Sequence, residues 1–134
     1  MPDFQMLLFS DQVLLFGVEI IMRELLQSKI HNATVTEANL AYIGSITIDE
    51  DLMEKVDLWS GQKVLVVSNT SGSRLETYVI PGKRNSGVIC MNGAAAHLIK
   101  EGEEIIIIGF VISPTPLQPK CILVDKNNQF VREL

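Results

Sequence analysis

The stretch Glu104-Ile105-Ile106-Ile107-Ile108-Gly109-Phe110-Val111-Ile112 decides the fold class of this chain. Isoleucine and valine dominate it, and β-branched residues of this kind favour an extended backbone. The run is also apolar for most of its length, which is typical of a strand that lies inside a protein rather than at its surface. We therefore predict a buried strand over residues 104–112.

Other short extended segments lie on both sides of this run. We predict strands at residues 25–30, 33–36, 46–48 and 88–91. Two hairpins are also indicated, one joining residues 63–68 to 75–80 through Asn69-Thr70-Ser71-Gly72, and one joining 121–124 to 130–131. Polar turn residues between β-branched runs are the signal for such hairpins.

Only two helical segments are indicated, and both are short. Asp49 can cap a helical turn in which Leu52, Met53 and Val56 recur at helical spacing. The second is the run Ala94-Ala95-Ala96-His97. We thus expect a mainly β chain, and a small closed barrel is the natural architecture because closure removes exposed strand edges.

Composition limits the classes of partner. The chain has 134 residues, enough for one domain, and its net charge is −5 with 11 scattered Lys and Arg residues, which argues against nucleic-acid binding. Cys90 and Cys121 have no CxxC spacing, and only His31 and His97 could add to them, so we expect no metal site and no disulfide. We interpret both cysteines as small buried side chains in a reducing cytoplasm.

Residues 1–21 differ from the rest of the chain. Their apolar runs are interrupted by Ser10-Asp11-Gln12, and the first basic residue is Arg23. A secretory signal needs a basic start and an unbroken apolar stretch, and a membrane span needs a longer one. We therefore predict no membrane association, an extension over residues 1–21, and a single domain over 22–134.

A chemical possibility lies at Gly44-Ser45, within Ala41-Tyr42-Ile43-Gly44-Ser45-Ile46. A serine hydroxyl can attack the preceding carbonyl and move the acyl group from nitrogen to oxygen, and glycine keeps that carbonyl open. Elimination from the resulting ester gives dehydroalanine, which hydrolyses to a pyruvoyl group and ammonia. Most Gly-Ser pairs are simple turns, so the pair alone predicts little.

The residues around this pair resemble the aspartate 1-decarboxylase family from about residue 22 to 112, whereas the tail after Ser113 matches loosely. Three motifs carry the resemblance: the Gly44-Ser45 pair, Arg74-x-x-Thr77-Tyr78, and Asn92-Gly93-Ala94-Ala95-Ala96-His97. Further matches are Leu26-Gln27-Ser28-Lys29-Ile30-His31, Val35-Thr36, Tyr42, Ile48-Asp49 and Val88-Ile89.

This resemblance implies a six-stranded double-psi β-barrel assembled as a homotetramer, with active sites between subunits. It also implies a zymogen that cleaves itself between Gly44 and Ser45 and carries a pyruvoyl cofactor derived from Ser45. The implied reaction is that of a lyase: L-aspartate is decarboxylated to β-alanine and carbon dioxide, on the route to pantothenate. The substrate would form an imine with the pyruvoyl ketone, which then accepts the electrons of the broken bond.

The resemblance also implies roles for individual residues. Arg74 and Lys29 are candidates to bind the substrate carboxylates, since arginine offers a planar fork for a carboxylate. Tyr78 is the candidate proton donor to the substrate carbon, because a phenol with a pKa of about 10 is protonated at neutral pH. Tyr42 is expected to line the pocket.

Other residues are implied to assist cleavage or to support the substrate. Thr77 resembles the residue that helps self-cleavage, by hydrogen-bonding the oxyanion at Gly44. His31 is a candidate near the same site, with a structural role as the alternative. The backbone and amide groups expected beneath the substrate are those of Asn92, Gly93, Ala94 and Ala95.

Three points stay open at this stage. Glu76 lies on the Arg74 and Tyr78 face of a regular strand, opposite Thr77, so a bulge or a site shared between subunits is needed to unite the motif. Cleavage is either spontaneous or assisted by a helper protein. The alternatives in function are a pyruvoyl decarboxylase for another small acidic amino acid and a non-catalytic β-barrel binding module.

Overall fold

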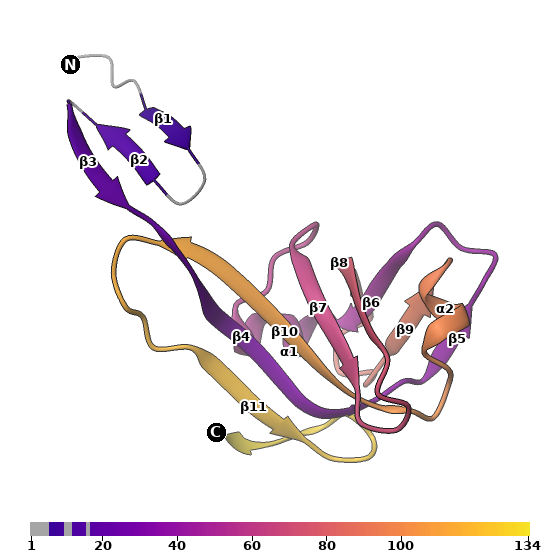
Figure 1. Cartoon of the computed structure of the whole chain (residues 1–134). Helices are drawn as coiled ribbons and strands as arrows, with labels where there is room; N and C mark the ends of the chain where they lie inside the picture. The colour runs from indigo at the N-terminus through magenta and orange to yellow at the C-terminus, as the bar shows by residue number, and fades with distance from the viewer. Residues whose placement is uncertain (1–5, 10–11, 16) are drawn as a thin grey trace.

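The chain is mainly β in the computed structural model, which describes residues 6–9, 12–15 and 17–134 (Figure 1). Two short helices accompany the strands, α1 (Glu50–Val56) and α2 (Ala95–Leu98). The described strands number twelve, so the expected count of six is wrong. Strands at residues 6–9, 12–15, 18–21 and 37–39 were not predicted from the sequence. The strands are β1 (Met6–Phe9), β2 (Gln12–Leu15), β3 (Val18–Ile21), β4 (Arg23–Thr34), β5 (Glu37–Asn39), β6 (Ser45–Asp49), β7 (Lys63–Ser68), β8 (Arg74–Gly82), β9 (Ile89–Asn92), β10 (Glu104–Ser113), β11 (Lys120–Val124) and β12 (Phe130–Glu133).

Nine strands form one sheet in the order β12-β11-β4-β10-β7-β8-β6-β9-β5. The isoleucine-rich strand β10 pairs with β4 on one side and β7 on the other. Ile105 and Ile107 are fully buried, which confirms the prediction of a buried strand. They belong to one continuous apolar core that also includes Ile30, Ile46 and Val64.

Strand β4 corrects one prediction. The sequence favoured two extended segments, 25–30 and 33–36, but the structure has one strand from Arg23 to Thr34. Its pairing with β10 shifts register between Ile105 and Ile107, and Asn32 has a positive φ of 61°. Such a bulge inserts an extra residue without ending the strand. The polar His31-Asn32 pair therefore marks a bulge rather than a break.

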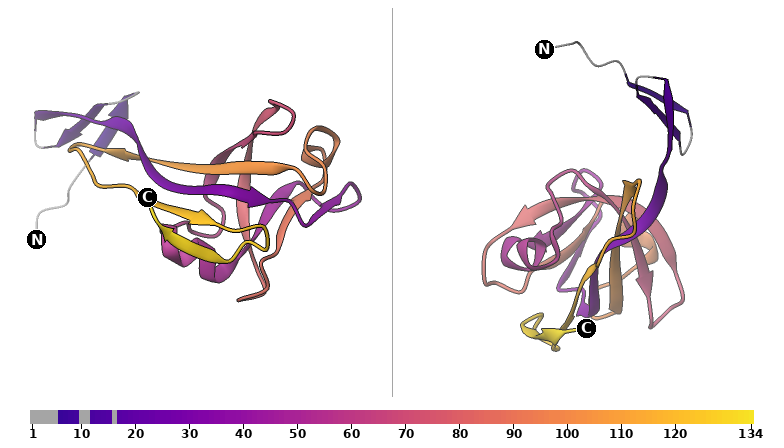
Figure 2. Two further views of the ribbon diagram at one scale, coloured as in Figure 1. Left: turned by 90° about the horizontal axis from the view of Figure 1, so that it is seen from below. Right: turned by 90° about the vertical axis from the view of Figure 1, so that its left-hand side faces the viewer.

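Both predicted hairpins are confirmed, since β7 pairs with β8 and β11 with β12 in antiparallel fashion. Three other pairs are parallel: β6 with β8, β5 with β9 and β4 with β11. Figure 2 shows how the strands of the main sheet curve around the core. This arrangement brings the start of β6 beside β8 and β9, two strands that lie far from it in sequence.

Helix α1 begins where the sequence predicts. The Asp49 side chain accepts a hydrogen bond from the Asp51 amide at 2.9 Å, and Leu52, Met53 and Val56 are buried. Asp49 also accepts from the amides of Asn85 (3.1 Å) and Gly87 (2.9 Å). A buried carboxylate is stable only when such donors satisfy it. Asp49 therefore ties the end of β6 to the 85–87 turn.

Strands β1, β2 and β3 form a separate three-stranded antiparallel sheet that precedes β4 (Figure 1). The predicted extension over residues 1–21 falls in part on residues 1–5, 10, 11 and 16, which lie outside the described part of the chain. Among the described residues, no helix is long and apolar enough to cross a membrane.

Candidate functional site

Ser45 lies at a boundary between buried and exposed chain. It is the first residue of β6 and only 1% exposed. The residues just before it lie at the surface, and Ile43 is 82% exposed. Gly44 precedes the strand and is itself exposed. The Gly44–Ser45 peptide bond thus joins an exposed loop to a buried strand.

Asn92 holds the Ser45 hydroxyl. Ser45 and Asn92 are opposite residues in the antiparallel β6–β9 pair, and Asn92 Nδ2 donates to Ser45 Oγ at 2.9 Å. The same nitrogen donates to Thr47 Oγ1 at 3.0 Å. The Ser45 hydroxyl in turn donates to the Ile43 carbonyl, with a longer distance of 3.4 Å. The oxygen that would attack therefore has a defined donor and a defined acceptor.

Gly93 brings a second backbone segment against Gly44. Its φ is +66°, and a Cβ atom placed there would lie 2.7 Å from the Gly44 Cα and 3.0 Å from the Tyr42 carbonyl oxygen. Real Cβ atoms do not approach this closely, so only glycine fits without a shift of the backbone. The Asn92-Gly93 pair thus forms a cradle for the Gly44–Ser45 bond.

A hollow of about 450 Å³ opens beside Ser45. Tyr42 and Tyr78 line it with Ser45, and both tyrosines are partly exposed, Tyr78 by 41%. Tyr78 reaches this position because the next residue, Val79, pairs with Ile46 in the parallel β6–β8 ladder. Three sequence-predicted site residues are therefore brought together. The lining consists of Ala41, Tyr42, Ile43, Ser45, Tyr78 and Ile80.

The rest of the Arg74-x-x-Thr77-Tyr78 motif follows regular pleating. The pairing of β7 with β8 runs without a register shift from Lys63–Tyr78 to Val67–Arg74. Arg74 and Tyr78 are exposed while Thr77 is half-buried, so Thr77 faces the opposite side. Along the described β7–β8 ladder there is thus no bulge to unite the three residues in one chain.

The charge of Glu76 has a local partner. Glu76 forms an exposed ion pair with Lys63 at 2.8 Å. The hydrogen bond from Lys63 and the attraction of the two charges raise the pKa of the Lys63 amine. Glu76 therefore has an oppositely charged neighbour on the exposed face of the hairpin.

Lys29 and His31 lie on β4, which β10 and β7 separate from β8 in the sheet order. Within the side chains that the structure describes, neither residue shares the Ser45 hollow or a hydrogen bond with Ser45. His31 Nδ1 is buried without a hydrogen-bond partner among them. Ala94 and Ala95 follow Gly93 directly, at the start of α2.

Cys90 is a neighbour of the site that the sequence interpretation treated only as a buried thiol. It is 7% exposed, and its Sγ donates to Asn92 Oδ1 at 3.0 Å. Burial raises the pKa of the Cys90 thiol, and the nearby Glu37 carboxylate adds to this effect. The signal that could have found it is the two-residue spacing of Cys90 and Asn92, which places both on one face of a strand.

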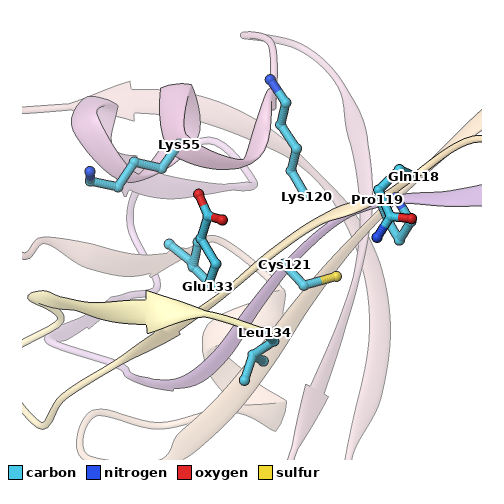
Figure 3. Close-up of a pocket in the computed structure, with 8 residues that line it drawn as sticks. Lys55, Gln118, Pro119, Lys120, Cys121, Glu133 and Leu134 are labelled. Carbon is cyan, nitrogen blue, oxygen red and sulfur yellow. The ribbon is translucent and has the colours of Figure 1, made fainter.

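A second hollow of about 480 Å³ lies elsewhere, between α1, β11 and the C-terminal residues (Figure 3). Lys55 comes from the helix, and Lys120 and Cys121 come from β11. None of the residues predicted to form the site lines this hollow. In the part of the chain that the structure describes, no group of three His, Cys, Asp or Glu side chains could hold a metal ion.

Comparison with known proteins identifies relatives over most of the chain. A family model described as aspartate decarboxylase matches residues 21–131. The aspartate 1-decarboxylase of Desulfitobacterium hafniense is 53% identical over 116 residues, covering 84% of this chain and 91% of that protein. The enzyme of the same name from Acetivibrio thermocellus is 55% identical over 111 residues, covering 80% and 88%.

A Bacillus velezensis protein, also named aspartate 1-decarboxylase, is 51% identical over 116 residues, covering 84% of this chain and 91% of that protein. Among solved structures, the computationally designed protein msDPBB_sym2 aligns with 66% of this chain and 100% of its own, with a TM-score of 0.39 and 16% identity. This overlap is too limited to establish a shared fold.

Proposed function

The chain belongs to the aspartate decarboxylase family and decarboxylates aspartate, and we propose that it does so with a pyruvoyl group made from its own Ser45. The products are β-alanine and carbon dioxide, and the reaction supplies the route to pantothenate. The observation that carries the proposal is the Ser45 hydroxyl, buried at the start of β6 and held by Asn92 Nδ2 at 2.9 Å beside an exposed Gly44.

The cleavage follows from the chemistry of Ser45. Its oxygen adds to the Gly44 carbonyl carbon, the peptide C–N bond breaks, and the serine nitrogen takes up the proton. The ester then loses the Ser45 Cα proton and breaks its Cβ–O bond, which releases the Gly44 carboxylate and leaves dehydroalanine. Addition of water and loss of ammonia complete the pyruvoyl group. Asn92 assists the second step, because its N–H lies on the ester oxygen that leaves with the negative charge of the Gly44 carboxylate.

The residues present fit such a group. The Gly93 cradle leaves no room for a side chain next to Gly44, and the hollow beside Ser45 has space for a small substrate. A bound pyruvoyl ketone supplies the electron sink that decarboxylation requires. Asn92 Nδ2 and the Gly93-Ala94-Ala95 backbone would hold and orient the substrate against it.

Tyr78 is proposed as the proton donor to the substrate carbon after carbon dioxide leaves. Its ring lines the hollow with Ser45, and Tyr42 lines the same hollow. An ordinary phenol is protonated at neutral pH and can therefore donate to a basic carbanion. Thr77 is proposed to hydrogen-bond the oxyanion at Gly44 during cleavage, a role that rests on the motif it shares with the family.

We further propose a homotetramer with active sites between subunits. The hollow is open, and apolar or aromatic side chains that line it are more exposed than a monomer needs, among them Tyr42, Ile43 and Tyr78. Lys29 and His31 lie on another strand, and Arg74 lies on the Tyr78 face of β8 but does not line the hollow. A neighbouring subunit could supply them to this hollow.

Two broader proposals accompany this one. The parallel pairs β6–β8, β5–β9 and β4–β11 within an otherwise antiparallel sheet support a closed double-psi β-barrel over residues 22–134. The unpaired thiols of Cys90 and Cys121 support a reducing cytoplasm as the location. We also propose that residues 1–21 are an extension that precedes this domain in sequence, and that a maturation helper protein is a partner.

The intact mass of the purified protein under denaturing conditions tests the function. We expect two chains, one ending at Gly44 and one beginning with a pyruvoyl group, lighter by one ammonia than a serine start. Adding aspartate should then yield carbon dioxide and β-alanine. A homogeneous uncut chain that still decarboxylates aspartate would overturn the pyruvoyl proposal. A cut chain that acts only on another acidic amino acid would redefine the substrate.

A further inference from the structure

The side chain of Cys90 contacts Asn92, the residue whose amide donates a hydrogen bond to Ser45. Cys90 and Asn92 project from the same face of β9, and they lie opposite Thr47 and Ser45 of β6. The thiol donates to Asn92 Oδ1 at 3.0 Å, and the amide nitrogen donates to both hydroxyls across the ladder. The four side chains form one directed chain of hydrogen bonds, from sulfur through the amide to the two oxygens.

An asparagine side chain can rotate by half a turn and exchange its oxygen with its nitrogen. In one orientation Nδ2 donates to Ser45 and Thr47, and in the other Oδ1 accepts from them. The two hydroxyls alone do not decide between these orientations, because each hydroxyl can donate or accept. A protonated thiol favours the first orientation, since it needs an acceptor and sulfur is itself a weak acceptor. Its other acceptor, the Met91 carbonyl, is farther away at 3.8 Å, compared with 3.0 Å for Asn92 Oδ1.

We propose that Cys90 is a positioning residue for self-cleavage: its thiol fixes the orientation of Asn92 so that an N–H, rather than a carbonyl oxygen, meets Ser45 Oγ. This inference rests on the proposed cleavage at Gly44–Ser45 and assigns a determinant of its rate. With Nδ2 on Ser45 Oγ, the hydroxyl proton is directed elsewhere, to the Ile43 carbonyl. The same N–H stays on this oxygen when the ester breaks, and it stabilises the negative charge that leaves with the Gly44 carboxylate.

Two features of the surroundings support this role. The thiol is 7% exposed and its raised pKa keeps it protonated, so it remains a donor. The reversed amide would instead place its carbonyl oxygen against Ser45 Oγ, and this oxygen would then have no donor when it leaves as part of the Gly44 carboxylate. A single hydrogen bond of this kind changes the activation free energy of cleavage only modestly. Loss of the thiol should therefore slow cleavage by about three- to tenfold rather than abolish it.

The test measures the rate of cleavage of freshly synthesised full-length chain in a cell-free reaction, resolved on denaturing gels. Cys90→Ala should cleave about three- to tenfold more slowly than the parent, whereas Cys90→Ser keeps a donor and should stay within about twofold. Cys121→Ala, which removes the other free cysteine on β11, should leave the rate unchanged. Equal rates for Cys90→Ala and the parent, or an equally slow Cys90→Ser, would overturn the proposal.

A double-mutant cycle separates positioning from packing. If the thiol acts through Asn92, then Cys90→Ala should cause no further slowing in a chain that already carries Asn92→Ala. A purely structural role would slow both backgrounds alike and would refute the inference. Should Cys90→Ala fail to fold, the pair Cys90→Thr and Cys90→Val has one shape and differs in a hydroxyl; Thr should cleave faster, and equal rates would count against the proposal.

Failure of the underlying function is distinguishable from failure of this inference. If the parent chain does not cut at all, the proposed cleavage and the role of Cys90 fall together. If the parent cuts and the Cys90 variants cut equally fast, only the role of Cys90 is lost.

Discussion

The two ends of strand β6 differ sharply, although only four peptide bonds separate them. At its start, Ser45 is preceded by exposed residues and receives one side-chain hydrogen bond, from Asn92. At its end, Asp49 is buried and accepts three backbone N–H groups from α1 and the 85–87 turn. The proposed scissile bond can thus be placed accurately because the strand is fixed at its far end, which leaves the near end free to change.

The largest effect should come from removing the reactive group itself. Ser45→Ala deletes the attacking oxygen, so we expect one intact chain with no measurable decarboxylation. Because the hydrogen bond from Asn92 and the longer one to the Ile43 carbonyl are lost, the free energy of unfolding should fall by about 1.5 kcal/mol relative to the uncut parent. Intact mass, an aspartate assay and thermal unfolding provide the readouts, and an active Ser45→Ala chain would contradict the assignment.

A second substitution, in the hollow beside the start of β6, should affect the turnover of substrate rather than the cleavage of the chain. Tyr78→Phe removes the phenolic proton and keeps the ring that lines the hollow. We expect normal cleavage and a kcat lower by about 100-fold or more, as is typical for loss of a general acid. Tyr42→Phe is the matched control in the same hollow and should reduce kcat much less. Near-normal turnover by Tyr78→Phe would remove it from the proposed role.

A substitution at the far end of β6 should lower the free energy of unfolding rather than the rate of the reaction. Asp49→Ala leaves three amides without their acceptor and removes the cap of α1, so we expect a loss of about 3 kcal/mol in the free energy of unfolding. Denaturant unfolding in a Ser45→Ala background measures this on an uncut chain. Arg84→Ala, which breaks only exposed ion pairs with α1, should cost far less. Equal losses would mean that Asp49 is not the anchor.

The smallest expected effect is on the free energy of unfolding, and it comes from removing the charge of Glu103, a buried carboxylate away from β6. Burial by itself raises the pKa of Glu103, but the hydrogen bonds from the Lys100 amide and the Ser68 hydroxyl outweigh it and leave the pKa below its usual value. Such a group stabilises the fold above an ordinary glutamate pKa of about 4.3, and the contribution is lost as the pH falls through the lower folded value.

Glu103→Gln should therefore cost about 1 kcal/mol near neutral pH, and the cost should vanish in acid once the parent carboxyl has been protonated. Chemical denaturation of both chains across this pH range is the measurement. A difference that stays constant with pH would show that the charge of Glu103 contributes nothing.

The local elements were largely predictable from the sequence. The bounds of β7 and the cap of α1 at Asp49 depend on neighbouring residues, and both were anticipated. The continuity of β4 was not, because a polar pair such as His31-Asn32 reads as a break whether it forms a loop or a bulge. The number of strands was also underestimated, since short strands such as β5 are defined by their partner and not by their own residues.

The candidate site was predictable only in part. Gly44, Ser45 and Tyr78 could be found because they form short motifs, and the structure places Ser45 and Tyr78 around one hollow. The bond from Cys90 to Asn92 and the register that sets Asn92 opposite Ser45 depend on which strands pair, which no local pattern specifies. The placement of Lys29, His31 and Arg74 toward a substrate remains a prediction from family resemblance.

The strand order has a consequence for the mature protein. Strands β4 and β5 both precede Gly44, and β4 lies between β10 and β11 inside the main sheet. Once the bond after Gly44 is cut, each subunit consists of two molecules that only non-covalent contacts hold together, and its denatured state gains the translational freedom of a second chain. Dilution then favours unfolding of the cut subunit, whereas the uncut chain pays no such entropic penalty. The proposed maturation would thus convert folding of each chain into an association equilibrium.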